Sequence, residues 1–461
     1  MKISCAAAAA SLLIAPTLAQ TQADPAYVRA LAAGYEAAFT CSATFNAGQT
    51  PAEIDANELT RVYGEYRDAV AELTPLIDGE KRAVSVTYDP DLPPRIAAWR
   101  RNLGCTQLPI GADPDMIGSL PVVDGGPPQF RNAPAWPYGD TGAEKLSSDP
   151  ALGRVVAKAF DSQTYGAGSK TSAVLIVHKG HIVAERYADG FDARTPQRTW
   201  SVAKSIAGTV LGVAAQQQRI DLLAPAPVPE WQSPGDPRGA ISTDQLMRMA
   251  SGLTSDFAGN RTDDIYLGGT SVADSSPGQS LLHRPGSAYR YANHDTLLAM
   301  YGLRHAMGDD KAYRALPFTE LFWKIGMTRT FPETDWRGDF VMSSQVWTTA
   351  RDLARLGLLY LNDGVWQGQR LLPRGFVGRV TTTGPAQPEG DWGYGATWWV
   401  ARAETGLPPG SYAARGNRGQ HLVVVPEMDL LVIRRGYDPV GEDMGFDIAA
   451  FSRDITGLMR E

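Results

Sequence analysis

The fold is decided by residues 199–215, which read TWSVAKSIAGTVLGVAA. Small and aliphatic side chains fill most of this run, so a helix formed here is apolar around most of its surface. Such a helix belongs in the interior of a large protein. Its one charged residue is Lys204, and a lysine in an apolar environment needs a partner.

Ser201 and Lys204 have the spacing of a nucleophile and its base. Residues three apart on a helix share one face, with Cβ atoms about 5–6 Å apart. The positive end of the helix dipole favours a serine alkoxide, and a desolvated lysine loses its proton near neutral pH. The spacing is common by chance, and a core serine beside a snorkelling lysine is the structural alternative. The apolar context of the pair favours catalysis.

A tyrosine is expected to complete this pair, and Tyr-x-Asn occurs twice. Tyr360 and Asn362 fall in a periodic amphipathic helix, where a core and C-cap role is expected. Tyr291 and Asn293 instead follow a turn, at a position typical of catalytic side chains. There the tyrosine hydroxyl would relay a proton, and the asparagine amide would fix the substrate or Lys204.

A glycine-rich segment around Gly416 enters the last predicted strand pair. Glycine lets a backbone approach a ligand closely and direct its amides toward it. Acyl transfer needs two N–H donors for the developing oxyanion, and the expected donors are the amides of Ser201 and of a residue near Ala414. Either Arg415 or Arg418 would bind a substrate carboxylate. A plain strand entry with solvated arginines is the alternative.

Two hairpins frame the catalytic region. Residues 173–187 and 420–434 each contain two apolar strands around a turn, whereas residues 222–379 are mostly helical. An amphipathic helix is predicted over 444–459. The fold class is therefore mixed α/β (α+β), with an antiparallel sheet built from both ends of the domain, flanking helices and a mainly helical insert.

Three regions are expected along the chain. Residues 1–19 have the charge, apolar run and small-residue end of a signal peptide cleaved near Ala19, which predicts export to the periplasm or medium. Residues 20–140 are expected to form a mostly helical region and an irregular linker, and residues 141–461 the catalytic domain. No run is long and apolar enough for a membrane span.

Export makes a disulfide the expected state of Cys41 and Cys105, the two cysteines that remain after the signal peptide. In the chain-entropy view it would contribute on the order of 4 kcal/mol. A catalytic cysteine is the weaker interpretation, because no Cys/His arrangement lies nearby.

Composition and motifs disfavour several other functions. The net charge is −7 without a basic block, so nucleic acid is not an expected partner. His178 and His181, the closest histidine pair, flank a hairpin turn and are not expected to hold a metal. The Gly-x-Ser-x-Gly pentapeptide of α/β-hydrolases is absent from the sequence.

Taken together, the motifs resemble the serine β-lactamase and penicillin-binding-protein superfamily. The likeness is strongest to the class C-related branch, and within it to 6-aminohexanoate-dimer hydrolases. The segments that carry it are RYADGF (186–191), WSVAKS (200–205), SGL (251–253), YAN (291–293), TARDLA (349–354), YLNDG (360–364) and GNRGQ (416–420). It spans about residues 150–460.

This resemblance implies hydrolysis of a small-molecule amide or ester through an acyl-enzyme. Ser201 would be acylated, Lys204 would act as base and Tyr291 as proton shuttle, with neither metal nor other cofactor. Alternatives that stay open are a non-catalytic or peptidoglycan-binding member of the fold, and a D-aminopeptidase or DD-peptidase.

The sequence departs from the superfamily at the last strand. The Lys-Thr-Gly or His-Thr-Gly of β-lactamases is missing, and an ungapped comparison puts Ser411–Ala413 in its place. The absent cation disfavours a β-lactam substrate, although Arg415 or Arg418 would be a substitute. An esterase or small-amide hydrolase fits better.

Overall fold

A computed structural model describes residues 25–60, 62–129, 134–143, 149–254, 262–440 and 445–460. The predicted signal peptide, residues 1–19 with its cleavage near Ala19, lies outside the described residues. Among the helices of the described ranges, none has both the length and the apolar character needed to cross a membrane.

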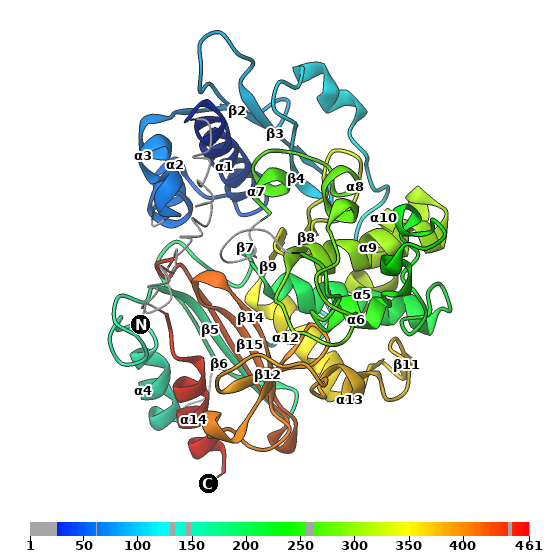
Figure 1. Cartoon of the computed structure of the whole chain (residues 1–461). Coiled ribbons are helices and arrows are strands. Elements are labelled where there is room, and N and C mark those ends of the chain that lie inside the picture. Colours follow the sequence, from blue (N-terminus) through cyan, green and yellow to red (C-terminus); the bar gives the residue numbers. More distant parts are fainter. Residues whose placement is uncertain are drawn as a thin grey trace, which may run out of the picture.

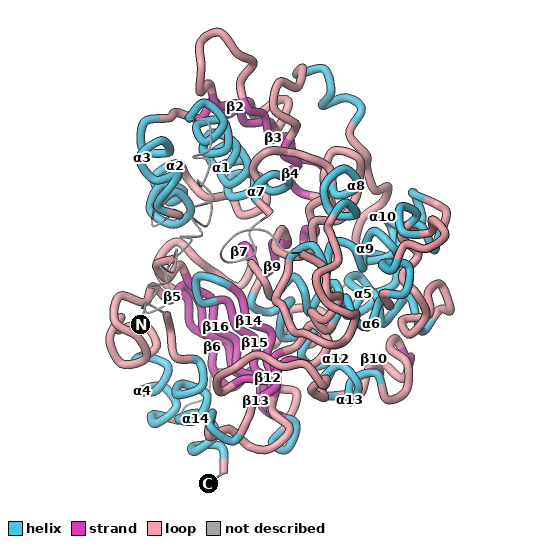
Figure 2. Tube along the Cα trace, viewed as in Figure 1, coloured by secondary structure: helices cyan, strands magenta, loops and turns pink. Residues whose placement is uncertain are grey.

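A seven-stranded antiparallel sheet forms the centre of the part of the chain after residue 140, which was predicted to be the catalytic domain and is called the catalytic region below (Figure 2). Its order is β12-β13-β14-β15-β16-β5-β6. The strands are β5 (Thr171–His178), β6 (His181–Tyr187), β12 (Trp392–Tyr394), β13 (Trp399–Ala401), β14 (Tyr412–Gly416), β15 (Gln420–Val425) and β16 (Leu430–Gly436). Because β5 pairs with β16, the first and last strands of the region meet inside the sheet rather than at its edges. The predicted sheet from distant segments is confirmed.

Helices cover both faces of this sheet. Alternate residues of a strand point to opposite faces. On β5, Val174 and Ile176 join one apolar cluster with helices α4 (Pro150–Lys158) and α14 (Ile448–Met459). Leu175 and Val177 join the larger core with helices α5 (Val202–Gln216) and α12 (Ala350–Leu361). The apolar stretch at 202–214 is therefore buried between the sheet and the helical insert, as predicted.

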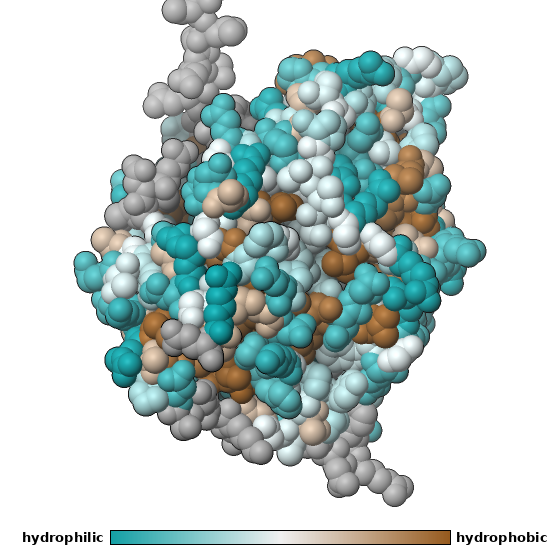
Figure 3. Space-filling model, turned by 90° about the horizontal axis from the view of Figure 1, so that it is seen from below, coloured by the Kyte–Doolittle hydropathy of each residue, from teal (hydrophilic) through white to brown (hydrophobic). Residues whose placement is uncertain are grey.

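The helical insert lies beside α5 and carries most of the loops (Figure 1). The helices of the insert and of the segment that follows it are α6 (Thr243–Met247), α7 (Asp263–Tyr266), α8 (Val272–Ser275), α9 (Asn293–Met307), α10 (Asp310–Leu316), α11 (Trp323–Ile325) and α13 (Phe376–Val380). Short strands β7 (Gln197–Arg198), β8 (Phe331–Pro332) and β9 (Val346–Thr348) form a small sheet, and β10 (Val365–Trp366) pairs with β11 (Gln369–Arg370). Seen from below, small apolar patches alternate with polar ones on the surface (Figure 3).

The N-terminal region is helical only in its first half. The elements are α1 (Pro25–Phe45), α2 (Pro51–Ile54), α3 (Gly64–Glu72), β1 (Pro75–Asp78), β2 (Ala83–Val86), β3 (Arg95–Arg100) and β4 (Gly104–Gln107). The four strands form an antiparallel sheet, so the expectation of a mostly helical region is wrong for its second half. Pro75 disfavours helix at the residue before it, and pairing between such short strands leaves little trace in the local sequence.

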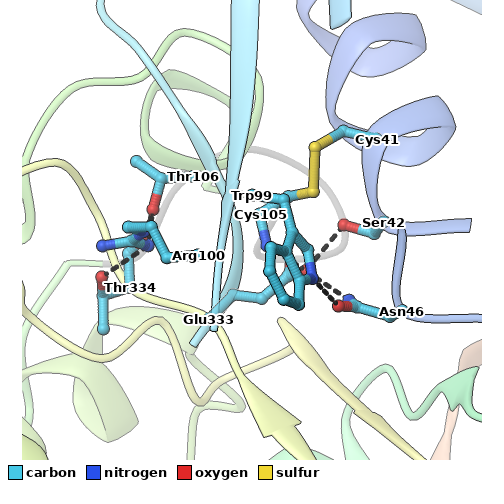
Figure 4. Close-up of a disulfide and its surroundings, with 9 residues drawn as sticks. All are labelled: Cys41, Ser42, Asn46, Trp99, Arg100, Cys105, Thr106, Glu333 and Thr334. Carbon is cyan, nitrogen blue, oxygen red and sulfur yellow. Dashed lines mark hydrogen bonds between the residues drawn. A yellow bond between two sulfur atoms is a disulfide. The ribbon is translucent and has the colours of Figure 1, made fainter. Parts of the chain in front are cut away.

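A disulfide and a buried carboxyl group fix α1 in place (Figure 4). Cys41 on α1 bonds Cys105 on β4, with an S–S distance of 1.98 Å, and this is the predicted pair. Glu333 accepts hydrogen bonds from Ser42 at 2.6 Å and Asn46 at 3.1 Å. The Cys105 amide also donates to Glu333, which therefore ties the helix, β4 and the catalytic region together.

Candidate active site

Ser201 stands at the junction of a short strand and the buried helix. Strand β7 ends at Arg198 and α5 begins at Val202, so the chain turns sharply in between. Trp200 makes this turn with φ 49°, in the left-handed region that bulky residues rarely adopt. Backbone strain of this kind clusters at functional sites. The turn presents Ser201 at the positive end of α5.

Lys204 is held against Ser201 by three acceptors. Its Nζ donates to Ser201 Oγ at 3.2 Å, to Asn293 Oδ1 at 2.6 Å and to the Ser343 carbonyl at 2.8 Å. Its side chain is 1% exposed. Burial lowers the pKa of Lys204 to about 7, because the charged form loses its hydration. At neutral pH a large fraction of this amine is therefore free to accept a proton.

Asp295, on the first turn of α9, was not singled out by the sequence. Burial raises the pKa of its carboxyl group to about 7, and Ser251 donates to it at 2.8 Å. Its charge acts on Lys204 in the direction that raises the lysine pKa. The only local indication of its role in the sequence is an acidic residue two positions after Asn293, within a segment whose neighbouring residues are mostly buried.

Tyr291 lies over the ammonium of Lys204, with Nζ 4.8 Å from the ring centroid. Burial raises the pKa of Tyr291 to about 12, although a hydrogen bond with Ser201 acts in the opposite direction. Trp399 stacks on its ring at 5.7 Å. Tyr360, the tyrosine of the other Tyr-x-Asn, hydrogen-bonds Thr209 and packs in the core instead.

Strand β14 approaches the nucleophile at Gly416. A Cβ there would collide with the Thr199 carbonyl and lie 3.0 Å from the Ser201 amide nitrogen. Ala414 is fully buried within the sheet, paired with Leu422.

This register corrects the ungapped comparison with the superfamily motif. Ser411 donates to the Pro408 carbonyl, and Tyr412 packs on Trp398 in the core. Gly416, three residues after Ala413, is the residue of this strand that approaches Ser201. The ungapped comparison failed because loop lengths before the strand are invisible in a motif.

Arg415 and Arg418 lie in different surroundings. The guanidinium of Arg415 sits 5.0 Å from the Trp392 ring and 5.3 Å from the Trp399 ring, and its charge acts on Tyr291. Arg418 is buried and donates to the Asp438 carbonyl. Arg415 is therefore the cation nearer to the candidate site.

A cavity of about 170 Å³ opens beside Ser201. Part of its wall comes from residues 263–267 and from Ser344. Another part comes from the N-terminal region, which no motif had connected with the site. The lining residues are Tyr35, Phe39, Tyr63, Arg198, Trp200, Ser201, Asp263, Tyr266, Leu267, Tyr291, Asn293, Ser344 and Asn417. Within the ranges that the structure covers, acidic, histidine and cysteine side chains form no group of three or more suited to a metal ion.

The chain belongs to the beta-lactamase family, whose sequence model matches residues 156–434. The antiparallel sheet, the buried helix behind Ser201 and the paired flanking helices are the architecture of this fold. The family is one of hydrolases built on the serine beta-lactamase fold.

Within that family, the chain is similar to a 6-aminohexanoate-dimer hydrolase of Paenarthrobacter ureafaciens. The two are 26% identical over 289 residues, covering 57% of this chain and 72% of the relative. Solved structures share the fold: a family VIII carboxylesterase has a TM-score of 0.52 at 17% identity, covering 68% of this chain and 98% of that one. A class C beta-lactamase has a TM-score of 0.50 at 13% identity, covering 67% and 95%.

Proposed function

We propose that the protein is an exported serine hydrolase that cleaves amide or ester bonds through an acyl-enzyme on Ser201. The observation that carries this proposal is Lys204, a buried amine 3.2 Å from Ser201 Oγ with a pKa lowered to about 7. A group that titrates near the working pH is suited to accept the serine proton and release it again within a catalytic cycle.

Acylation follows from the hydrogen bonds around this amine. Neutral Lys204 accepts the Ser201 proton while Oγ attacks the carbonyl carbon and forms a tetrahedral oxyanion. Tyr291, kept protonated by its raised pKa, donates its proton to the departing nitrogen or oxygen and recovers one from Lys204. The scissile bond then breaks and leaves the acyl group on Ser201. Water attacks this ester by the reverse sequence and releases the acid.

The oxyanion is proposed to lie between the Ser201 amide and the end of β14. The approach of Gly416 to the Ser201 nitrogen supports a donor from the backbone of Gly416 or the residue after it rather than from Ala414. Removing one donor of an oxyanion hole typically costs about 10²–10³ in rate.

A short amide or ester is the proposed substrate class, in the manner of the 6-aminohexanoate-dimer hydrolase and the carboxylesterase among the similar proteins. A β-lactam is disfavoured, because the segment from Ser411 to Gly416 contains neither Lys-Thr-Gly nor His-Thr-Gly. The cation of Arg415 packs near the rings of Trp392 and Trp399 instead.

Export is proposed from residues 1–19 and is consistent with the Cys41–Cys105 disulfide, which persists in oxidising compartments. Measuring the N-terminus of the mature protein from the periplasmic fraction would test it. A mature chain that begins at Met1 would contradict it.

Labelling with a fluorophosphonate probe tests the nucleophile. We expect wild type to be labelled and Ser201→Ala to remain unlabelled. Ser205→Ala is the matched control, because Ser205 lies on the same helix and donates to the Thr397 carbonyl at 2.6 Å. Labelling that persists in Ser201→Ala would contradict the assignment.

The base and the substrate class need separate measurements. Lys204→Met should abolish turnover while changing the unfolding free energy by no more than about 1 kcal/mol, because a buried amine costs desolvation. A panel of nitrophenyl esters, anilides and the 6-aminohexanoate dimer then ranks ester against amide. Full activity of Lys204→Met would rule out its role as base.

A further inference from the structure

The N-terminal region forms one wall of the cavity beside Ser201. Tyr35 and Phe39 come from α1, and Tyr63 immediately precedes α3. The family match begins at residue 156, so this wall lies outside the residues that the family model matches. Figure 1 shows α1 beside α7, whose residues line the same cavity.

The wall is anchored rigidly. Gly34 lets α1 approach the catalytic region so closely that a Cβ there would collide with the Leu267 carbonyl oxygen. The Cys41–Cys105 disulfide and the hydrogen bonds of Glu333 hold the following turns of the same helix. An aromatic side chain on this helix therefore has a fixed position relative to Ser201.

Aromatic contacts connect the wall to the residue before the nucleophile. The Tyr35 and Phe39 rings stack with centroids 4.0 Å apart. The guanidinium of Arg198 lies over both the Phe39 and the Trp200 rings, at 4.2 and 3.9 Å from their centroids. Phe39 thereby supports Trp200, which makes the strained turn into Ser201.

A second contact reaches the other side of the site. The Tyr63 hydroxyl accepts a hydrogen bond from Asn417 Nδ2 at 3.0 Å. Asn417 follows Gly416, the residue that approaches the Ser201 amide. Tyr63 is only partly buried, so its ring faces the cavity and limits the space beyond the backbone at the end of β14.

The charged residues that line the cavity are one cation and one anion, and both have protein partners. Arg198 donates to Ser344 Oγ at 3.0 Å and is enclosed by the two rings. Asp263 accepts from the Tyr66 hydroxyl at 2.6 Å. A substrate group in this cavity therefore meets aromatic faces and a lining without net charge.

We propose that the α1–α3 segment sizes the substrate: it restricts the enzyme to amides and esters of short, uncharged acyl groups, with Tyr63 and Phe39 as specificity-determining residues. This inference rests on the proposed function of Ser201. It assigns to the N-terminal region the task of limiting the length of the substrate group that enters this cavity.

The test is an acyl-length series measured on the full chain. We expect kcat/KM for p-nitrophenyl octanoate to be at least about tenfold below that for butanoate, since each methylene in a hydrophobic pocket is worth about 10-fold or more. Tyr63→Ala should raise the octanoate-to-butanoate ratio about tenfold, equivalent to about 1.4 kcal/mol. The hemisuccinate ester, which ends in a carboxylate, should react at least about tenfold more slowly than the butanoate ester.

Two further variants keep the result interpretable. Phe39→Leu keeps an apolar side chain on α1 but opens the ring stack, so it should raise the same ratio about threefold by relieving part of the steric limit. Tyr27→Ala is the matched control, because Tyr27 is an aromatic residue of the same helix, 42% exposed and outside the cavity lining. It should leave the ratio unchanged, and thermal unfolding checks that each variant is folded.

The outcomes separate the two proposals. Wild type that hydrolyses octanoate as fast as butanoate, or a ratio unchanged in both folded wall variants, would overturn this inference alone. Wild type that hydrolyses none of the esters and resists the fluorophosphonate would overturn the proposed function, and this inference with it.

Discussion

Asn293→Asp tests whether Lys204 is the titrating base more directly than removal of any proposed catalytic group. Asn293 Oδ1 lies 2.6 Å from Lys204 Nζ, so the substitution puts a carboxylate where a neutral amide stood. An opposite charge this close raises an amine pKa by about one to three units. From a starting pKa of about 7, the free-base fraction at pH 7 falls from about one half to between about a tenth and a thousandth. Acylation at pH 7 should therefore slow by about 5- to 500-fold.

The assay is the pH dependence of fluorophosphonate labelling and of kcat/KM for a nitrophenyl ester. For wild type we expect both rates to rise about tenfold per pH unit below about pH 7 and to level above it, as the Lys204 base form accumulates. Asn293→Asp should move this inflection to higher pH and recover most of its rate there. Asn362→Asp, at the exposed C-cap of α12 in the other Tyr-x-Asn, is the matched control and should keep the wild-type profile. An inflection unmoved in folded Asn293→Asp, or equal losses at every pH, would refute Lys204 as the titrating base.

Three other perturbations probe the frame around the site. Gly416→Ala should lower kcat/KM at least about 10²-fold, because its Cβ collides with the Thr199 carbonyl and displaces a proposed oxyanion donor. Gly457→Ala is the control, because its Cβ meets open space on α14, and it should leave kcat/KM unchanged. Equal rates for the two variants would argue against a requirement for the close approach of Gly416. Cys41→Ser should lower the unfolding free energy by about 2–5 kcal/mol in denaturant titrations, and an unchanged midpoint would show that the other α1 contacts suffice. Burial raises the pKa of Glu333 to about 7. The contribution of protonated Glu333 to the free energy of unfolding is therefore complete below about pH 4 and is lost as the pH rises through 7. Wild type should thus lose about 3 kcal/mol relative to Glu333→Gln over that interval, and parallel stability curves would contradict it.

The local sequence pattern was sufficient to predict the elements that position the candidate site. The apolar run after Ser201 predicted a buried helix, because few sequences of that composition are stable at a surface. Turn residues before Tyr291, and the amphipathic helical pattern around Tyr360, predicted which tyrosine lies in a loop and which in the core. The structure brings Tyr291 and Asn293 to Lys204 and buries Tyr360 against Thr209.

The rest depended on contacts between distant segments. Tyr35, Phe39 and Tyr63 reach the cavity only because a helix and a disulfide-linked sheet dock on the catalytic region, and no short-range pattern records docking. The register of β14 was similarly hidden, because it is set by pairing with β15 rather than by the motif itself. The four-stranded sheet of the N-terminal region was not predicted for the same reason, since the apolar residues of such short strands acquire a face only when the strands pair.

One physical cause, burial, sets the protonation of two groups at the candidate site. Lys204 and Asp295 both have pKa values brought to about 7 by desolvation, one downward and the other upward. An ionised Asp295 would raise the pKa of Lys204, so a base that is free near neutrality requires the aspartate to remain costly to ionise.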